Sequence, residues 1–191
     1  MDNFVSIYII CILLLISYIY YESYYSELVN VESTIDGRSY LVRGLPDKSD
    51  AANLLASVRK KLIQLVNHLE IKFTDDQRVA RLLLRYRPDS LMESTPNNKY
   101  TSYSINKGEK VVLCLRSRNS KNILVKENLL MFVALHELSH IMTKSIGHTK
   151  EFWDNFRFLL SESIKIKIYN KQNFRKFPKE YCGTQITDSP L

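Results

Sequence analysis

Lysine and arginine are absent from the first 37 residues, and this absence divides the chain into two parts. The first part carries five acidic side chains, whereas residues 38–191 hold all 27 Lys and Arg against 15 Asp and Glu, a net charge of +12. An excess of this size favours an anionic neighbour, such as a nucleic acid or a lipid surface. A solvated basic face is nevertheless the more common reason for it.

Cysteine is scarce, and acceptor sites for N-glycosylation are absent. No Asn is followed two positions later by Ser or Thr, and the three cysteines, Cys11, Cys114 and Cys182, are odd in number and widely spaced. Both features agree with a domain that faces the cytosol, without deciding it. Because Cys11 lies in an apolar run, only Cys114 and Cys182 could pair within the domain.

Charge of either sign is missing from residues 4–21, FVSIYIICILLLISYIYY. At about 1.5 Å per residue this run forms a helix of roughly 27 Å, close to the hydrocarbon thickness of a bilayer. We interpret residues 1–21 as a transmembrane anchor. A cleaved signal peptide is the alternative, but Asp2 stands where a basic residue is expected and no small-residue cleavage site follows. The first cations, Arg38 and Arg43, favour a cytosolic position for the C-terminal side.

The remaining chain is predicted to hold an acidic stalk, residues 22–37, and one folded domain, residues 38–191. A short strand, RSYLVRG, is expected at its start. Apolar residues at steps of three and four predict a helix from about Asp50. A second helix follows, with a capping box of Thr74 and Gln77.

The second half of the domain continues the alternation of helix and strand. YTSYSIN and EKVVLCLR predict a hairpin that turns at Lys107 and Gly108. A third helix is predicted from about Glu127 to Thr143 and a fourth from about Thr149 to Tyr169, before an irregular tail. The sequence therefore predicts an α+β fold of about four helices and a short antiparallel sheet.

Three of the four histidines lie within the stretch HELSHIMTKSIGHTKEFW, residues 136–153. His136 and His140 are four residues apart, so one face of a helix can present both to a single metal ion. Glu137 lies at the edge of that face, where its carboxylate can reach a metal-bound water. A catalytic zinc needs a third protein ligand and one open position. Gly147 ends the helix and His148 follows at once, which makes His148 the predicted third ligand.

Other residues remain candidates for roles at this site. Glu162, on the fourth helix, is the alternative third ligand, and His68 is interpreted as an ordinary surface or boundary residue. The pattern predicts hydrolysis in which zinc polarises a water and Glu137 takes its proton. Candidates for an oxyanion stabiliser are Tyr103, Tyr169 and Tyr181. The strand EKVVLCLR could also present its edge to an extended peptide.

The motifs resemble those of a known family. NKGEKVVLCLRSR, followed by LLMFVALHELSHIM and GHTKEFW, resembles the WLM-type zinc metallopeptidases, relatives of the SprT-like group. A second resemblance, from DGRSYLVRGLPDKSDAANLLA to YCGTQITDSPL, is to membrane-anchored proteins of this class encoded by large double-stranded DNA viruses. Seven residues separate His140 from His148, where WLM members usually have fewer.

The resemblance implies a small zincin-like fold with Zn²⁺ on His136, His140 and His148 and with Glu137 as the general base. It also implies a virion inner membrane or host endomembrane, with the domain on the cytosolic or virion-interior side and viral capsid or membrane proteins as neighbours. Two other functions stay open. One is a structural virion membrane protein in which zinc only pins two helices together, and the other is a DNA-associated basic protein. Glu137 favours a peptidase acting on protein or peptide substrates, because a purely structural zinc has no use for that carboxylate.

Overall fold

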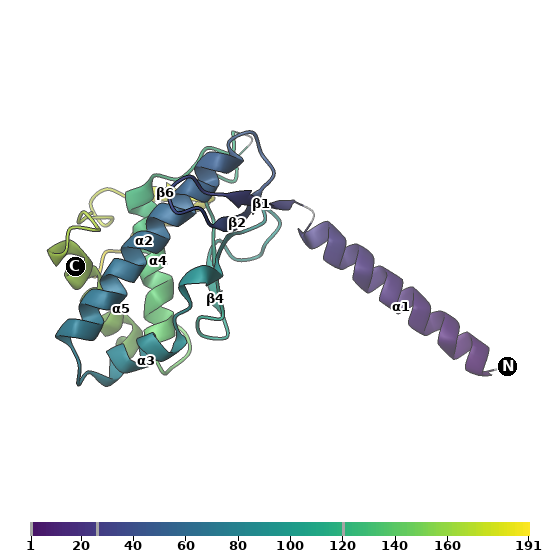
Figure 1. Cartoon of the computed structure of the whole chain (residues 1–191), viewed down its shortest axis with the longest axis horizontal. Helices are drawn as coiled ribbons and strands as arrows, with labels where there is room; N and C mark the ends of the chain where they lie inside the picture. Colours follow the sequence, from purple (N-terminus) through teal and green to yellow (C-terminus); the bar gives the residue numbers. More distant parts are fainter. Residues whose placement is uncertain (1, 26, 120) are drawn as a thin grey trace.

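The computed structural model describes residues 2–25, 27–119 and 121–191 (Figure 1). Ser26, in the predicted stalk, and Ser120, before the third predicted helix, lie outside the described residues, as does Met1. The described residues form five α-helices, one short 3-10 helix and seven short strands. The predicted α+β class is confirmed.

Helix α1, Asp2–Tyr25, contains the apolar run and stands apart from the other helices in Figure 1. Its segment Phe4–Tyr21 has a mean hydropathy of 2.3, and none of that segment is buried. Within the described part of the chain this is the one helix long and apolar enough to cross a membrane. An anchor and a signal sequence share these properties.

An antiparallel hairpin of β1, Leu28–Glu32, and β2, Ser39–Arg43, follows α1. The predicted first strand is β2, whereas β1 lies inside the predicted stalk. Leu28 is buried and Val31 packs against the core. This part of residues 22–37 is therefore a strand and not a spacer, because its apolar side chains find a partner in the folded body.

Both helices predicted for the first half of the domain are present, as α2, Lys48–Lys72, and α3, Gln77–Arg85. The capping box of Thr74 and Gln77 is wrong. Asp76 occupies the N-cap of α3, where its carboxylate accepts a hydrogen bond from the backbone N–H of Arg78 at 2.8 Å. Aspartate next to the first turn satisfies the free N–H groups of the helix directly.

A 3-10 turn, Pro88–Ser90, leads into a sheet with the order β3-β5-β4, formed by Leu91–Glu93, Lys110–Leu113 and Tyr103–Ile105. The predicted hairpin is confirmed as β4 and β5. However, β3 pairs with β5 in parallel, so the sheet is mixed and not antiparallel. Because β5 has a neighbour on each side, the prediction that its edge receives a peptide is wrong.

Helix α4, Glu127–Met142, lies at the centre of the body. It packs against α2, α3 and α5 and against strands β4 and β5, and Figure 1 shows it running alongside α2. Every residue from Leu130 to Leu135 is buried. A helix enclosed on all sides is expected to be apolar all round, and this enclosure fixes α4 rigidly in the fold.

Helix α5, Lys150–Lys165, packs on α4 and ends before the predicted boundary at Tyr169. The end is set by Lys167, which adopts a left-handed φ of +60°. The N–H of Ile168 then donates to the carbonyl of Ser163 at 3.0 Å, a hydrogen bond that closes a helix C-terminus.

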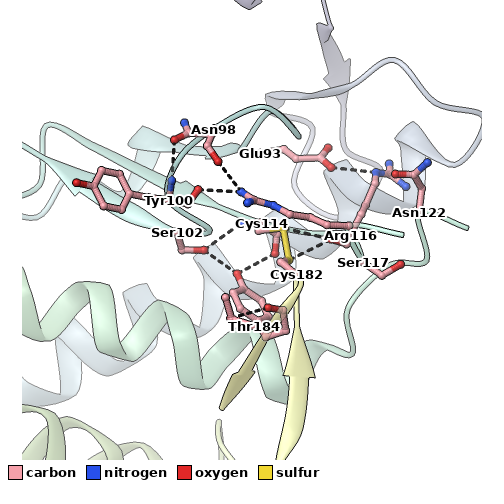
Figure 2. Close-up of a disulfide and its surroundings, with 12 residues drawn as sticks. Glu93, Asn98, Tyr100, Ser102, Cys114, Arg116, Ser117, Asn122, Cys182 and Thr184 are labelled. Atoms are coloured by element: carbon pink, nitrogen blue, oxygen red, sulfur yellow. Dashed lines mark hydrogen bonds and ion pairs between the residues drawn. A yellow bond between two sulfur atoms is a disulfide. The ribbon is translucent and has the colours of Figure 1, made fainter. Parts of the chain in front are cut away.

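The tail predicted to be irregular contains a second hairpin, β6, Lys179–Tyr181, and β7, Thr184–Ile186. Its two-residue turn has positive φ at both positions, as this kind of hairpin requires. Figure 2 shows the disulfide that joins Cys182 in this turn to Cys114, just after β5. The pair left open by the sequence is thus formed, and it attaches the tail to the body.

Candidate metal centre

Three imidazoles from two parts of the chain converge at the C-terminal end of α4. His136 and His140 lie one turn apart on that helix, and His148 comes from the loop before α5. One ring nitrogen of each lies within 4.8 Å of the other two. This is the one group of three potential metal ligands among the described His, Cys, Asp and Glu side chains.

The spacing of the three rings matches a single small cation. The Nε2 atom of His136 is 3.2 Å from that of His140 and 3.0 Å from that of His148. Tetrahedral zinc with bonds of about 2.05 Å places its nitrogen ligands roughly 3.3 Å apart. The donor set and the distances from His136 to the other two histidines therefore fit zinc, and all three ligand nitrogens lie within 4.8 Å of one another.

A buried aromatic ring holds the three histidines in place. Phe152, in the first turn of α5, is fully buried, and its ring centroid lies 4.8, 4.3 and 4.7 Å from those of His136, His140 and His148. Trp153 adds a contact with His148 at 5.8 Å. The aromatic pair after the third histidine is thus the packing partner of all three ligands.

The two histidines of α4 are held neutral. Burial, together with His140 and His148, lowers the pKa of His136 to about 3. Burial, His148 and Lys107 lower the pKa of His140 to about 4. A neutral imidazole keeps a free lone pair near pH 7, which is the form that binds a metal.

Glu137 is next to these ligands and is 4% exposed. Burial raises its pKa to about 8, and a backbone hydrogen bond from Ser104 on β4 offsets only part of this. A positive charge at the three histidines would lower the pKa again, because a nearby cation favours the carboxylate. A cation bound by the three histidines would therefore stabilise the charged form of Glu137.

The loop to the third histidine is formed as its residues suggest. Gly147 adopts φ +81°, and nothing lies within 4 Å of where its Cβ would be. Thr149 caps α5, its side chain accepting a hydrogen bond from the N–H of Phe152. The predicted helix break is present, and Thr149 provides the cap of the helix that follows.

Glu162, the alternative third ligand, lies away from the histidine cluster. Its carboxylate meets His68 at 2.9 Å and Lys72 at 3.1 Å, and it also pairs with Lys165. Although burial alone would raise it, hydrogen bonds from these three side chains hold the pKa of Glu162 at about 2. The structure thus brings His68 and Glu162 together in an ion-pair network and excludes Glu162 from the metal centre.

Of the three tyrosines considered, only Tyr181 lines the cavity beside the site. Its hydroxyl donates to the Cys114 carbonyl at 2.8 Å and contacts the hydroxyl of Ser102 at 2.7 Å. The Ser102 hydroxyl in turn accepts from the backbone N–H of Cys114 at 3.0 Å, an arrangement centred on the disulfide in Figure 2. Tyr181 therefore attaches the β6–β7 hairpin to the residues around Cys114, and its hydroxyl proton is directed at the Cys114 carbonyl and not at the histidines.

Ser102 lines the cavity, but no pattern in the sequence singled it out as a candidate. It lies before β4 and lines the cavity together with Tyr181 of the C-terminal hairpin, whose hydroxyl it contacts. No local motif marks such a residue, since its role depends on a pairing between distant segments.

The cavity beside the site has a volume of about 390 Å³. Its polar side carries His136, Glu137 and His148, and its other walls include the apolar side chains of Phe132, Val133, Trp153, Phe156 and Ile186. A larger cavity of about 490 Å³ lies along residues 123–129 and 179–182 and contains none of the histidines. We take the smaller one as the site, because the reactive groups are there.

Proteins of viruses and one solved fold are similar to this chain. It is 38% identical over 170 residues to Uncharacterized protein R325 of Acanthamoeba polyphaga mimivirus, covering 87% of this chain and 86% of that protein. It is 33% identical over 82 residues to Uncharacterized protein 136R of Invertebrate iridescent virus 6, covering 42% and 44%. The crystal structure of Wss1 from Saccharomyces cerevisiae superimposes with a TM-score of 0.50 at 22% identity, covering 66% of this chain and 88% of that one.

The family model for the WLM domain matches residues 36–190. This range includes β2, all four helices of the folded body and the three converging histidines. The resemblance seen in the motifs is thereby confirmed over most of the chain, and the protein belongs to the WLM domain family.

Proposed function

We propose that the protein is a zinc-dependent peptidase attached to a membrane by α1. The observation that carries this proposal is the convergence of three imidazoles beside Glu137, a buried carboxyl group that forms no ion pair among the described side chains. Membership of the WLM domain family and the Wss1-like fold support the same reaction class.

His136, His140 and His148 would hold the zinc, which supplies Lewis-acid polarisation of a water and of the scissile carbonyl. Glu137 then acts as the general base and accepts the proton of the attacking water. It can return that proton to the leaving amine, so that one carboxyl group serves both halves of the hydrolysis. Glu137 suits this task because it lines the same cavity as His136 and His148, and a cation on these histidines would keep it in the carboxylate form that accepts a proton.

The number of ligands favours a catalytic zinc site over a structural one. A structural zinc has four protein ligands, whereas a catalytic zinc keeps one position open for water. Among the described residues the cluster contains three candidate ligands, and neither a cysteine nor a carboxylate joins them as a fourth. The open position would face the cavity that Glu137 also lines.

The walls of the cavity indicate the kind of substrate. Phe132, Trp153 and Phe156 give its interior an apolar surface next to the proposed metal. Such a surface favours a peptide with an apolar side chain adjacent to the scissile bond, since burying that side chain contributes to binding. A protein or peptide is therefore the proposed substrate.

The cellular setting is part of the proposal. The exposed apolar helix supports anchorage in a membrane, and the mimivirus and iridescent virus relatives support a viral membrane or virion. The Cys114–Cys182 disulfide removes one reason for expecting a reducing cytosol, because disulfides persist in oxidising surroundings. A position inside the virion, next to capsid or membrane proteins, is compatible with both the membrane helix and the disulfide.

The test is cleavage of a peptide library by the full chain in detergent micelles, loaded with zinc and analysed by mass spectrometry. We expect zinc-dependent cleavage beside apolar residues, with a loss of cleavage in Glu137→Gln. Zinc-loaded wild-type protein that cleaves nothing, or cleavage retained in Glu137→Gln, would contradict the proposal. Zinc binding without any cleavage would favour a structural virion protein, and retention on DNA with a steep salt dependence would favour the DNA-associated alternative.

A further inference from the structure

The loop that carries His148 has little packing to fix it. Of residues 144–149 only Ser145 is not exposed, and Ile146 is 90% exposed. The loop is also long, with seven residues between His140 and His148. A metal ligand has to be held to within a fraction of an ångström, so something other than burial must fix this loop.

The carbonyl groups of the loop are held by a lysine from the sheet. The Lys107 ammonium donates to the carbonyl of Ser145 at 2.7 Å, of Thr143 at 3.0 Å and of His140 at 3.4 Å. An ammonium group has three hydrogen-bond donors, and here each has an acceptor. The cation also lies at the C-terminus of α4, where the helix dipole favours positive charge.

The base of this lysine is itself fixed. Lys107 is in the β4–β5 turn with a left-handed φ of +56°, and Gly108 follows with φ +114°. A Cβ at Gly108 would lie 2.8 Å from the carbonyl oxygen of Arg85 and 3.2 Å from the side chain of Ile141. The turn is thus pressed between the end of α3 and α4, so Lys107 extends from a rigid support.

The amide groups of the same loop are held by a residue of α5. The carboxylate of Glu151 on α5 accepts from the N–H of Lys144 at 3.1 Å and from the N–H and hydroxyl of Ser145 at 3.3 and 3.0 Å. Arg81 donates to the carbonyl of Met142 at 2.6 Å. Ser145 is therefore held through its carbonyl by Lys107 and through its amide by Glu151.

We propose that Lys107 is a positioning residue for the third metal ligand. By binding the carbonyls of His140, Thr143 and Ser145, it sets the path of the loop so that His148 reaches His136. This inference rests on the proposed metal site, and it explains how a loop with little packing can still deliver its histidine. Lys107 itself touches neither the metal nor the substrate.

The test is a thermodynamic cycle on zinc affinity, measured on the full chain in detergent micelles by competition with a chromogenic chelator. Lys107→Met should weaken zinc binding by about 10–100-fold, the usual loss when a group that orients a ligand is removed. Lys107→Arg should recover part of the affinity, because a planar guanidinium keeps the charge but cannot direct three donors to these carbonyls. Lys110→Met, an exposed lysine of the same hairpin, is the matched control and should bind like wild type.

The same substitution is then made in the His148→Ala background. If Lys107 acts through His148, Lys107→Met should produce little further loss there. An equal loss in both backgrounds, or no loss in the wild-type background, would overturn the inference. Cobalt(II) spectra provide a second readout, since wild type and Lys110→Met should show the absorption of a three-histidine site and His148→Ala should not.

These experiments distinguish failure of the proposed function from failure of the inference about Lys107. Wild-type protein that binds no zinc would defeat the proposed function, whereas zinc binding that is unaffected by Lys107→Met would defeat the inference alone. If circular dichroism shows that Lys107→Met does not fold, the cycle is run with Lys107→Gln, which keeps a hydrogen-bond donor and should show a smaller loss of the same pattern.

Discussion

Glu137 of α4 and Glu162 of α5 are buried to the same degree, 4% and 2% exposed, but their surroundings are opposite. Glu162 is surrounded by Lys72, Lys165 and His68. Glu137 receives a backbone hydrogen bond from Ser104 and, within the described part of the chain, forms no ion pair. The pKa values diverge accordingly, to about 8 for Glu137 and about 2 for Glu162.

The difference shows what each carboxylate contributes. Cations in the fold itself already stabilise the charge of Glu162, so this residue ties α2 to α5 and supports stability. Glu137 lacks such a partner and lies beside histidines that can bind one. A buried carboxyl group without a cationic partner in the fold is characteristic of a reactive site. A buried carboxylate that already forms ion pairs is characteristic of a structural role.

The largest expected effect is on turnover. Glu137→Gln should reduce peptidase activity by about 10²–10⁴-fold, the usual contribution of a general base, while Glu162→Gln should leave activity within about twofold. The measurement is the initial rate on the best peptide found, at equal zinc content. Similar losses in both variants would show that the comparison of the two glutamates is wrong.

The disulfide that attaches the β6–β7 hairpin should give the second-largest effect. Cys182→Ser opens a disulfide that spans 68 residues, which should lower the free energy of unfolding by about 3 kcal/mol. Because the hairpin that forms one wall of the cavity is attached there, peptide binding should weaken while the Glu162 network is unaffected. Urea denaturation and KM together measure this, and an unchanged midpoint would contradict it.

Glu162→Gln should destabilise the protein by about 2 kcal/mol near neutral pH, since it removes a buried charge that hydrogen bonds from His68, Lys72 and Lys165 stabilise. A carboxyl whose pKa is lowered on folding contributes stability above its unfolded pKa and loses it as the pH falls through the folded value. The difference from wild type should therefore shrink below about pH 4.5 and disappear near pH 2. Urea denaturation over this range is the measurement, and a constant difference would refute the ion-pair account.

The smallest effect has the opposite sign. A carboxyl whose pKa is raised on folding contributes its full stability below the unfolded pKa and loses it as the pH rises through the folded value. Zinc-free Glu137→Gln should thus match wild type near pH 4.5 and become progressively more stable than wild type as the pH rises to 8, because Gln carries no charge to bury. Melting temperatures of the zinc-free proteins measure this, and a loss of stability at pH 8 would count against the buried, unpaired state of Glu137.

Local patterns in the sequence were sufficient to predict the helix that carries the first two histidines and the loop that carries the third. The four-residue step from His136 to His140 and the glycine before His148 predicted both the helix and its break. The helices of the body were found from apolar spacing, which depends only on near neighbours. The prediction agrees with the structure here because the apolar side chains of α4 are buried on all sides, as the sequence pattern of this helix requires.

Features that depend on distant partners could not be read in the same way. Strand β1 pairs with β2 across a turn, and β3 pairs in parallel with β5, so neither is visible as a local pattern. Arg116, fully buried between Glu93 and Asp47, looks like any surface arginine in the sequence. Lys107 and Ser102 likewise gain their roles only when the fold brings other segments to them.

The most direct test of the central claim is the zinc content of the full chain, purified without added metal, for wild type, His148→Ala and His68→Ala. His68 is the matched control, because it is the one histidine outside the cluster. We predict about one zinc per chain in wild type and in His68→Ala, and a much lower content in His148→Ala, as a three-histidine site requires. Folded wild-type protein without zinc, or zinc retained in full by His148→Ala, would contradict the account.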